Sequence, residues 1–284
     1  NLDVLNYSGR EENLEEINGN PNYKFVRGDI CDVDKLEDII GDFDVIVNFA
    51  AETHVDRSVT GPLKFINPNI MGVTKLLEFS RRKKTDLFLQ ISTDEVYGDV
   101  AVNSKNLFPE TSSLKPSSPY SSTKAAGDLL CLSYYRSFGV PVIVTRGSNT
   151  YGPNQYPEKI IPFFVKQLIN GKKVPVYGDG KNTRDWLYVR DHARGIEMAL
   201  LKGTPGEIYN ISAEEYHTNI ELTKKIINIL KKPISSIEFV KDRPGHDRKY
   251  VPDSTKIRRE LGWQPEANFD EALVETVMWY KENL

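Results

Sequence analysis

Short apolar runs alternate along the chain with longer segments of mixed apolar and charged residues. Residues 43–50, 87–91 and 140–146 are such runs, rich in Val, Ile, Leu and Phe, and this pattern is typical of buried strands. Residues 1–5 resemble the end of a strand, and a further strand is predicted at 23–26. Helices are predicted at 11–17, 32–40, 69–82, 119–135, 253–261 and 269–280, and another begins at Asn219.

This alternation of strands and helices is typical of an α/β protein with a parallel sheet. The alternation loosens after residue 150. We therefore expect one domain over 1–150 and a second over 151–284, with part of the second stretch returning to the first domain.

Composition excludes several classes of function. The 284 residues are 39% hydrophobic and 27% charged, as in a soluble globular protein with a substantial core. The net charge of −3 gives no basic bias, so nucleic acid is not expected as a partner. Because no apolar run approaches the roughly 18 residues that span a membrane, no membrane partner is expected either.

The two cysteines, Cys31 and Cys131, form neither a disulfide framework nor a zinc signature. We expect both to be small buried side chains in a reducing compartment, the cytoplasm. No metal site is expected.

The first candidate for chemistry is the pair Tyr120 and Lys124. At i and i+4 on a helix the two side chains share a face. A nearby ammonium group lowers the pKa of a phenol, which is otherwise about 10, and so lets it act as a base near neutral pH. The same spacing also arises by chance in surface residues, so the pair alone does not decide the question.

The second candidate is the pair Asp94 and Glu95, directly after the strand 87–91. In an open parallel sheet, ligands lie beyond the carboxyl ends of the strands. Two carboxyl groups in different environments can hold different protonation states and act as an acid and a base. Adjacent carboxylates after a strand are also common as solvated loop charges.

Together these residues resemble a known family. The run S-T-D-E-V-Y-G at 92–98, followed by Y-S-S-T-K at 120–124, resembles the extended short-chain dehydrogenases/reductases, and most closely their dTDP-glucose 4,6-dehydratase branch. The resemblance covers nearly the whole chain. It implies a Rossmann-type doubly wound sheet, a smaller C-terminal α/β domain that binds a nucleotide sugar, and NAD as cofactor. It also implies a homodimer, in which the helices that begin at Asn69 and Tyr120 form a four-helix bundle with those of the partner.

The resemblance also implies roles in catalysis. Tyr120, helped by Thr93 and Lys124, would remove the proton of the hexose 4-hydroxyl while hydride passes from C4 to NAD. Glu95 would then remove the C5 hydrogen, and Asp94 would protonate the departing 6-hydroxyl. Return of hydride to C6 would give the 4-keto-6-deoxy sugar.

The cofactor residues that the resemblance implies lie at the ends of several predicted strands. Asp3 would meet the adenosine ribose and favour NAD over NADP, although it could also be solvated. Asp29 would contact adenine; alternatively it starts the helix 32–40, which Asp32 or Asp34 could cap. The full set is Asp3, Val4, Leu5, Asn6, Asp29, Ile30, Ala50, Ala51, Glu52, Tyr120 and Lys124.

The glycine-rich turn of a dinucleotide-binding unit does not precede residues 1–5. The resemblance places that turn and the first strand upstream, in a segment of about 30 residues, the usual size of a strand–helix unit. Alternatively the chain lacks them and binds NAD poorly or not at all.

The substrate residues that the resemblance implies lie mainly after residue 145. Thr150 departs from the family pattern and is given no role. His54 could be mistaken for a base, but we favour a role in fixing its loop. The set is Thr53, Thr93, Asn149, Glu158, Lys159, Pro175, Val176, Tyr177, Arg184, Asn219, Arg243 and His246.

Other functions are compatible with the same fold. A UDP-sugar 4-epimerase would use Tyr120 and Lys124 but has no need of Asp94 and Glu95. A UDP-glucuronate decarboxylase typically carries Ser where Asp94 stands. A non-catalytic NAD-binding protein is supported only by the absent glycine turn.

Overall fold

The computed structural model describes residues 1–101, 107–242 and 246–284. Its contacts divide the chain into two compact units of three segments each. The chain leaves the first unit after Thr145, five residues before the predicted boundary at 150. It also enters the second unit earlier, from Thr93 to Ser117, and this segment was not predicted. Unit 1 is Asn1–Ser92, Ser118–Thr145 and Gly203–Ile208, and unit 2 is Thr93–Ser117, Arg146–Lys202 and Tyr209–Leu284.

A four-stranded sheet of order β3-β4-β5-β9 forms the centre of unit 1, and the last residues of β4, β5 and β9 belong to unit 2. β3 and β4 are parallel, with Val45 opposite Leu87. Most of β4 is buried, which explains its continuous apolar sequence, because strands covered on both faces show no alternation. The strands are β3 (Val45–Asn48), β4 (Leu87–Thr93), β5 (Val142–Gly147) and β9 (Ile208–Ile211).

Two shorter strands, β1 (Leu2–Asp3) and β2 (Val26–Arg27), pair in parallel as a separate sheet of unit 1. The strands predicted at 1–5 and 23–26 are therefore present but shorter, and β2 extends one residue further. The helices of unit 1 are the 3-10 helices Glu11–Ile17 and Ile30–Leu36, α1 (Glu37–Ile40), α2 (Val55–Thr60), α3 (Leu63–Ile66), the π-helix Asn67–Gly72, α4 (Val73–Lys83) and α5 (Pro119–Phe138).

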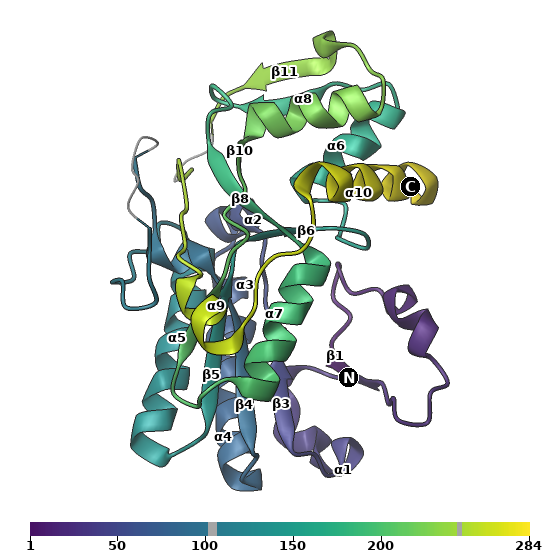
Figure 1. The fold of residues 1–284 in the computed structure, drawn as a ribbon. Helices are drawn as coiled ribbons and strands as arrows, with labels where there is room; N and C mark the ends of the chain where they lie inside the picture. Colours follow the sequence, from purple (N-terminus) through teal and green to yellow (C-terminus); the bar gives the residue numbers. More distant parts are fainter. Residues whose placement is uncertain (102–106, 243–245) are drawn as a thin grey trace. The chain divides into compact units, whose positions relative to one another are not determined.

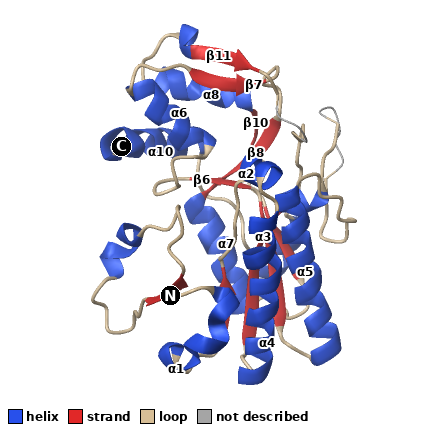
Figure 2. Ribbon diagram, turned by 180° about the vertical axis from the view of Figure 1, so that it is seen from behind, coloured by secondary structure: helices blue, strands red, loops and turns tan. Residues whose placement is uncertain are grey.

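Helices α4 and α5 lie side by side across one face of the sheet (Figure 2). Their inner faces join the strands in an apolar core that includes Leu77, Phe79, Phe88, Cys131 and Val142. Cys131 is thus a buried small side chain, as predicted, whereas Cys31 is partly exposed.

One predicted helix start was wrong. The segment predicted as helix 32–40 begins at Ile30, and Asp29 caps it by accepting a hydrogen bond from the backbone nitrogen of Cys31 at 2.8 Å. Asp32 and Asp34 lie inside this helical segment. The capping residue is therefore Asp29 and not Asp32 or Asp34, because the helical segment already includes Ile30 and Cys31.

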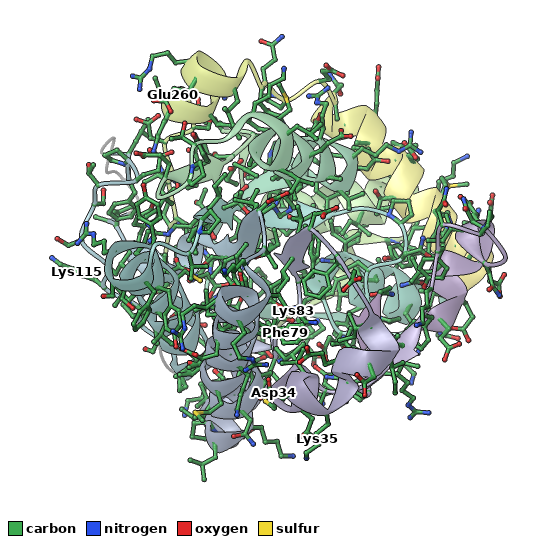
Figure 3. The ribbon with its side chains drawn as sticks, turned by 90° about the horizontal axis from the view of Figure 1, so that it is seen from below. Asp34, Lys35, Phe79, Lys83, Lys115 and Glu260 are labelled. Carbon is green, nitrogen blue, oxygen red and sulfur yellow. The ribbon has the colours of Figure 1, made fainter. Side chains whose placement is uncertain are left out.

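The basic run 81–84 ends α4 and pairs with acidic side chains of unit 1. Arg82 lies 2.5 Å from Asp34, and Lys83 lies 2.7 Å from Glu37. Figure 3 shows Lys83 and Phe79 of α4 together with Asp34 at this end of the unit. Cations at a helix C-terminus are stabilised by the helix dipole, so this run is accounted for as a helix end.

Unit 2 holds a three-stranded sheet of order β10-β8-β6, antiparallel between β10 and β8 and parallel between β6 and β8. A second sheet pairs β7 with β11 in parallel. The strands are β6 (Asn149–Tyr151), β7 (Val174–Tyr177), β8 (Thr183–Tyr188), β10 (Tyr216–Thr218) and β11 (Ile237–Val240).

The helices of unit 2 include three, α6, α8 and α10, that lie together beside the β7–β11 sheet (Figure 1). They share an apolar core with members such as Phe164, Leu222 and Val277. The helices are the 3-10 helices Asp94–Tyr97 and Ile234–Ser236, α6 (Ile160–Ile169), α7 (Val189–Lys202), α8 (Asn219–Ile229), α9 (Thr255–Leu261) and α10 (Phe269–Asn283). Among the described residues, no helix is long and apolar enough to cross a membrane.

Candidate active site

The predicted helix of Tyr120 and Lys124 is α5 in unit 1, and its start is fixed by a capping box. The Ser118 hydroxyl accepts from the backbone nitrogen of Ser121 at 3.1 Å, and the Ser121 hydroxyl accepts from that of Ser118 at 3.0 Å. Pro119 in the first turn suits a helix start. These residues fix where the helix begins and therefore which side Tyr120 and Lys124 share.

Both side chains are buried, which does not fit a chance pair of surface residues. Tyr120 and Lys124 are 7% and 5% exposed. The Tyr120 ring packs edge-on against Phe65, with 6.4 Å between ring centres. The Lys124 side chain donates a hydrogen bond to the Ile91 carbonyl at 2.7 Å. Burial lowers the pKa of Lys124, and the nearby carboxyl group of Asp128 opposes that change.

A cavity of about 1030 Å³ in unit 1 collects most of the predicted cofactor residues. This volume is at the upper end of the range for small-molecule sites, roughly 300–1,000 Å³. Leu5, Tyr120 and Lys124 are not among the described residues that line it. The predicted residues that do line it are Asp3, Val4, Asn6, Asp29, Ile30, Ala50, Ala51 and Glu52.

Hydrogen bonds hold the loop after β3 in place at this cavity. The backbone nitrogen of Glu52 donates to Asn69 Oδ1 at 2.9 Å, and Asn69 Nδ2 donates to the Glu52 carbonyl at 3.0 Å. Asn69 Nδ2 also donates to the Thr123 hydroxyl on α5 at 2.9 Å. The side chain of Glu52 accepts from Asn6 at 2.9 Å. The small side chains of Ala50 and Ala51 leave the cavity wall open to a bulky ligand.

His54 does what was predicted of it. Its Nδ1 accepts a hydrogen bond from the backbone nitrogen of Arg57 at 3.3 Å and so caps α2. The role of a loop-fixing residue is confirmed. Thr53, the predicted substrate contact beside it, is exposed.

Thr93, Asp94 and Glu95 form a tight turn in unit 2. The Thr93 hydroxyl accepts from the backbone nitrogen of Glu95 at 3.3 Å and caps the 3-10 helix Asp94–Tyr97. Asp94 is only 2% exposed, and its Oδ2 has no hydrogen-bond partner among the described residues. Asp94 is therefore not a solvated loop charge, and Glu95 is only partly exposed.

Burial raises the pKa of Asp94 well above its usual value. The charges of Glu95 and Asp185 raise it further, while Arg184 lowers it. This environment favours the neutral carboxylic acid, which can donate a proton. A buried, neutral carboxylic acid is what the predicted role of Asp94 as a proton donor requires, and that role stays a prediction.

The sequence analysis missed Asp185. It lies fully buried on β8, where it accepts from the Ser212 hydroxyl at 2.5 Å and from the backbone nitrogen of Glu215 at 2.8 Å. Tyr216 on β10 was missed as well; its burial raises the pKa of the phenol, and the charges of Asp185 and Asp94 add to that effect. A carboxylate directly before the apolar run Trp186–Tyr188 was the available signal for Asp185.

Arg184 is buried beside this cluster. Its guanidinium donates to the carbonyls of Thr183 at 2.8 Å and Asp247 at 2.9 Å. It also lies over the Tyr250 ring, 4.6 Å from the ring centre. Two of its donors are thus used within unit 2, and its predicted contact with the substrate stays a prediction.

Two of the predicted substrate residues lie together in unit 2. The rings of Tyr177 and His246 meet edge to face with 6.0 Å between their centres. His246 Nδ1 is 2.6 Å from Asp242 Oδ1. Val176, in contrast, belongs to the apolar core, while Pro175 is partly exposed. The predicted Arg243 lies outside the described residues.

The remaining predicted substrate residues lie at the starts of elements in unit 2 or directly before them. Asn149 begins β6 opposite Trp186. Asn149 Oδ1 and Trp186 Nε1 are buried with no hydrogen-bond partner among the described residues. Lys159 follows Glu158 and directly precedes α6, and Asn219 begins α8 as predicted.

Comparison with known proteins identifies the family. Residues 1–276 match the family model described as GDP-mannose 4,6 dehydratase. The chain belongs to this dehydratase family. A dTDP-glucose 4,6-dehydratase from Streptomyces niveus is 48% identical over 99% of this chain and 83% of the relative.

Solved structures of a dehydratase and of an epimerase match nearly the whole chain. A dTDP-glucose 4,6-dehydratase from Streptomyces venezuelae, crystallised with NAD, matches with a TM-score of 0.96 and 43% identity over 99% of this chain and 87% of the other. A UDP-glucuronic acid 4-epimerase from Bacillus cereus matches with a TM-score of 0.92 but 28% identity, over 100% and 90% of the two chains. The predicted Rossmann-type α/β fold and the predicted resemblance to the dehydratase family are confirmed.

Proposed function

We propose that this protein dehydrates dTDP-glucose to dTDP-4-keto-6-deoxyglucose, with NAD as its cofactor. Relatives of that activity align with nearly the whole chain. The observation that carries the proposal is the burial of Asp94 beside Glu95. An elimination of water needs an acid and a base, whereas a 4-epimerase needs neither of these two groups.

The cavity of unit 1 fits NAD. Asp3 at the end of β1 offers a carboxylate for the ribose hydroxyls, a choice that favours NAD over NADP. Asp29, Ile30, Ala50, Ala51 and Glu52 line the same cavity. When bound, NAD accepts a hydride from C4 of the hexose and later returns it to C6.

The first task of the protein is to remove a proton from the 4-hydroxyl. Tyr120 is the base for this step, and the amine of Lys124 one turn later favours its phenolate. The Thr93 hydroxyl helps to orient the same sugar hydroxyl. Oxidation at C4 produces a ketone, which acidifies the neighbouring C5 hydrogen.

The second task is elimination. Glu95 takes the proton from C5, and Asp94 gives its proton to the 6-hydroxyl, which leaves as water with the electron pair of the C6–O bond. The buried, neutral Asp94 and the more exposed Glu95 suit these opposite roles. Glu95 then returns the proton to C5.

Residues of unit 2 are proposed to hold the nucleotide sugar. Asn149, Glu158 and Lys159 would contact the sugar or its phosphates, and Arg184 and Arg243 the diphosphate. The segment Pro175–Tyr177 would enclose the base. His246, whose ring meets that of Tyr177 edge to face, would contact the diphosphate or the ribose. Asn219 and Thr53 complete the proposed contacts.

We further propose a homodimer through α4 and α5. On unit 1, the side chains of Leu129, Tyr135 and Phe138 on α5 and of Met71 before α4 are large, apolar and exposed, as at interfaces between subunits. The substitution Leu129→Asp should halve the molar mass measured by light scattering; a monomeric wild type would contradict the proposal.

The free thiols of Cys31 and Cys131 support a reducing compartment such as the cytoplasm.

The decisive experiment incubates the full-length protein with dTDP-glucose and, separately, with UDP-glucose. Loss of water from dTDP-glucose, detected by mass spectrometry, is the expected result. Loss of water from UDP-glucose alone would keep the chemistry and change the substrate. An epimerised sugar of unchanged mass would contradict the roles of Asp94 and Glu95.

Variants assign the steps. With Asp94→Asn or Glu95→Gln, rapid quenching should trap a 4-keto hexose that still carries its 6-hydroxyl, because oxidation proceeds and elimination does not. With Tyr120→Phe, the sugar should remain unoxidised. Normal dehydration in the two carboxyl variants would show that the assignment is wrong.

A further inference from the structure

Tyr97 ends the turn that carries Asp94 and Glu95, and its side chain is almost completely buried in unit 2. It is 1% exposed. Its ring stacks on Phe108, with 5.3 Å between ring centres and 15° between the planes. A ring held on its face in this way has little freedom to move, and the turn is attached to it.

Two buried polar side chains hold the Tyr97 hydroxyl from different elements. The hydroxyl donates to Asn210 Oδ1 on β9 at 2.8 Å and accepts from Arg146 Nη1 on β5 at 2.8 Å. The Arg146 guanidinium also lies over the ring, 4.8 Å from its centre. Arg146 and Asn210 are 2% and 0% exposed, so this is an interior network and not a surface contact.

Asn210 is itself immobilised. Its Nδ2 donates to the carbonyls of Phe108 at 2.9 Å and Asp253 at 3.0 Å, and its backbone nitrogen donates to Glu110 at 2.9 Å. The amide has therefore no freedom to rotate away from Tyr97. A fully satisfied buried network of this kind fixes a single arrangement of the chain segments that it joins.

The backbone also holds the end of the turn at which Tyr97 lies. The Lys115 nitrogen donates to the Val96 carbonyl at 3.1 Å. Gly98 has a φ of +81°, and a Cβ at this position would lie 2.1 Å from the Lys115 carbonyl oxygen. The turn Asp94–Tyr97 is thus fixed at Thr93, at Val96 and, through its side chain, at Tyr97.

We propose that Tyr97, held by Arg146 and Asn210, is a positioning residue that fixes the acid–base turn for the elimination step. The inference rests on the proposed dehydration and adds residues that touch neither sugar nor cofactor. It differs from a purely structural role because it predicts that one step of the reaction is affected and the others are not.

The Tyr97 hydroxyl keeps its proton throughout the working pH range. Burial raises its pKa to about 12, and Arg146 acts in the opposite direction. The phenol therefore remains a neutral donor to Asn210 and an acceptor from Arg146. The effect of removing it should be the same at every pH at which the enzyme works.

The test compares Tyr97→Phe with Tyr280→Phe in the full-length enzyme. Tyr280 is also buried in unit 2, and its hydroxyl donates to the carbonyls of Gly152 at 3.0 Å and Gln155 at 2.8 Å. It has no part in the turn. Both variants lose one buried hydroxyl, so both should lower the unfolding temperature to a similar extent.

Of these two tyrosine variants, only Tyr97→Phe should change catalysis. We expect kcat to fall about 10- to 100-fold, because a misplacement of about 1 Å can cost about 100-fold, while KM for dTDP-glucose changes less than twofold, or roughly 0.4 kcal/mol. Rapid quenching should trap the 4-keto hexose that retains its 6-hydroxyl. Tyr280→Phe should turn over normally. Asn210→Ala removes the oxygen that accepts the hydrogen bond of the Tyr97 hydroxyl, so this variant should trap the same 4-keto hexose.

Other outcomes overturn the inference. Normal kcat in Tyr97→Phe, or an equal loss of kcat in Tyr280→Phe without the trapped ketone, would reduce Tyr97 to a core residue. If the wild type itself released no water from a nucleotide hexose, the proposed function would fail and this inference with it. An active wild type with unaffected variants refutes the inference alone.

Discussion

The side-chain nitrogen of Lys124 lies 2.7 Å from the carbonyl oxygen of Ile91 and donates a hydrogen bond to it. This bond joins α5 to β4 within unit 1. Because Tyr120 lies one turn before Lys124 on the same helix, the bond also fixes the phenol relative to the strand.

Replacing Lys124 with Met should therefore remove both the charge that favours the Tyr120 phenolate and the bond to the strand. We expect kcat to fall by about 10²–10⁴-fold, the usual contribution of general acid–base catalysis. Steady-state turnover of dTDP-glucose measures it. Lys35→Met, which removes an exposed lysine of the same unit, serves as the control, and an equal effect in both variants would contradict the role.

Asp94→Asn should make the protein more stable at neutral pH while it abolishes elimination. Burial raises the pKa of Asp94 in the folded state, whereas an aspartate in the unfolded chain titrates at about pH 4. At a pH between these two pKa values, Asp94 is ionised in the unfolded chain and protonated in the folded protein. Wild-type stability therefore falls as pH rises through that window. Asparagine resembles the neutral acid and has no such loss.

Urea denaturation at about pH 7 and about pH 3.5 measures this difference, because below about pH 4 Asp94 is protonated in both states. The advantage of the variant should be present at the higher pH and smaller at the lower. An advantage of equal size at both pH values would show that Asp94 is ionised in the folded protein.

Asp185→Asn should shift the pH dependence of kcat. The charge of Asp185 helps to raise the pKa of Asp94, so its removal lowers that pKa. The alkaline limb of the kcat profile, where Asp94 loses its proton, should then move to lower pH. The single oxygen of asparagine can still accept from the backbone nitrogen of Glu215, and its amide nitrogen can donate to the Ser212 hydroxyl, which limits structural damage. An unmoved limb with unchanged structure would exclude this electrostatic role.

Gly98→Ala should destabilise the protein by about 1–3 kcal/mol through backbone strain, and more through its clash with the Lys115 carbonyl. Gly262→Ala is the matched control. Gly262 has a φ of +72° in the same unit, but nothing lies within 4 Å of an added Cβ. Thermal unfolding should show a clearly larger loss of stability for Gly98→Ala than for Gly262→Ala. Equal losses of stability would mean that the turn relaxes and accommodates the added methyl group.

The elements that local pattern determines were predicted well. The strand at 87–91 and the helix that begins at Pro119 are present, because a continuous apolar run and a Ser-Pro start are local signals. Edges were less accurate. The strand predicted at 43–50 is only Val45–Asn48, and the helix at 32–40 begins earlier with Asp29 as its cap.

The candidate site was predicted only as far as its motifs are contiguous. Tyr120 with Lys124 and Asp94 with Glu95 stand close in sequence. The burial of Tyr120, Lys124 and Asp94 excludes the surface alternative for these three residues. The bond from Tyr97 to Asn210 joins residues 113 positions apart. Asp185 acts on Asp94 from strand β8, about 90 positions further along the chain. No spacing rule links such residues, since only the folded chain brings them together.

In unit 1, the side-chain amide of Asn69 connects the loop after β3 to helix α5 through hydrogen bonds. Its oxygen accepts from Glu52, and its nitrogen donates to Glu52 and to Thr123. A carboxylate of the same shape would lose both donated bonds, and an apolar side chain would lose all three. The loop at the cavity and the helix of Tyr120 therefore share a single amide, and neither can be redesigned without a suitable replacement at this position.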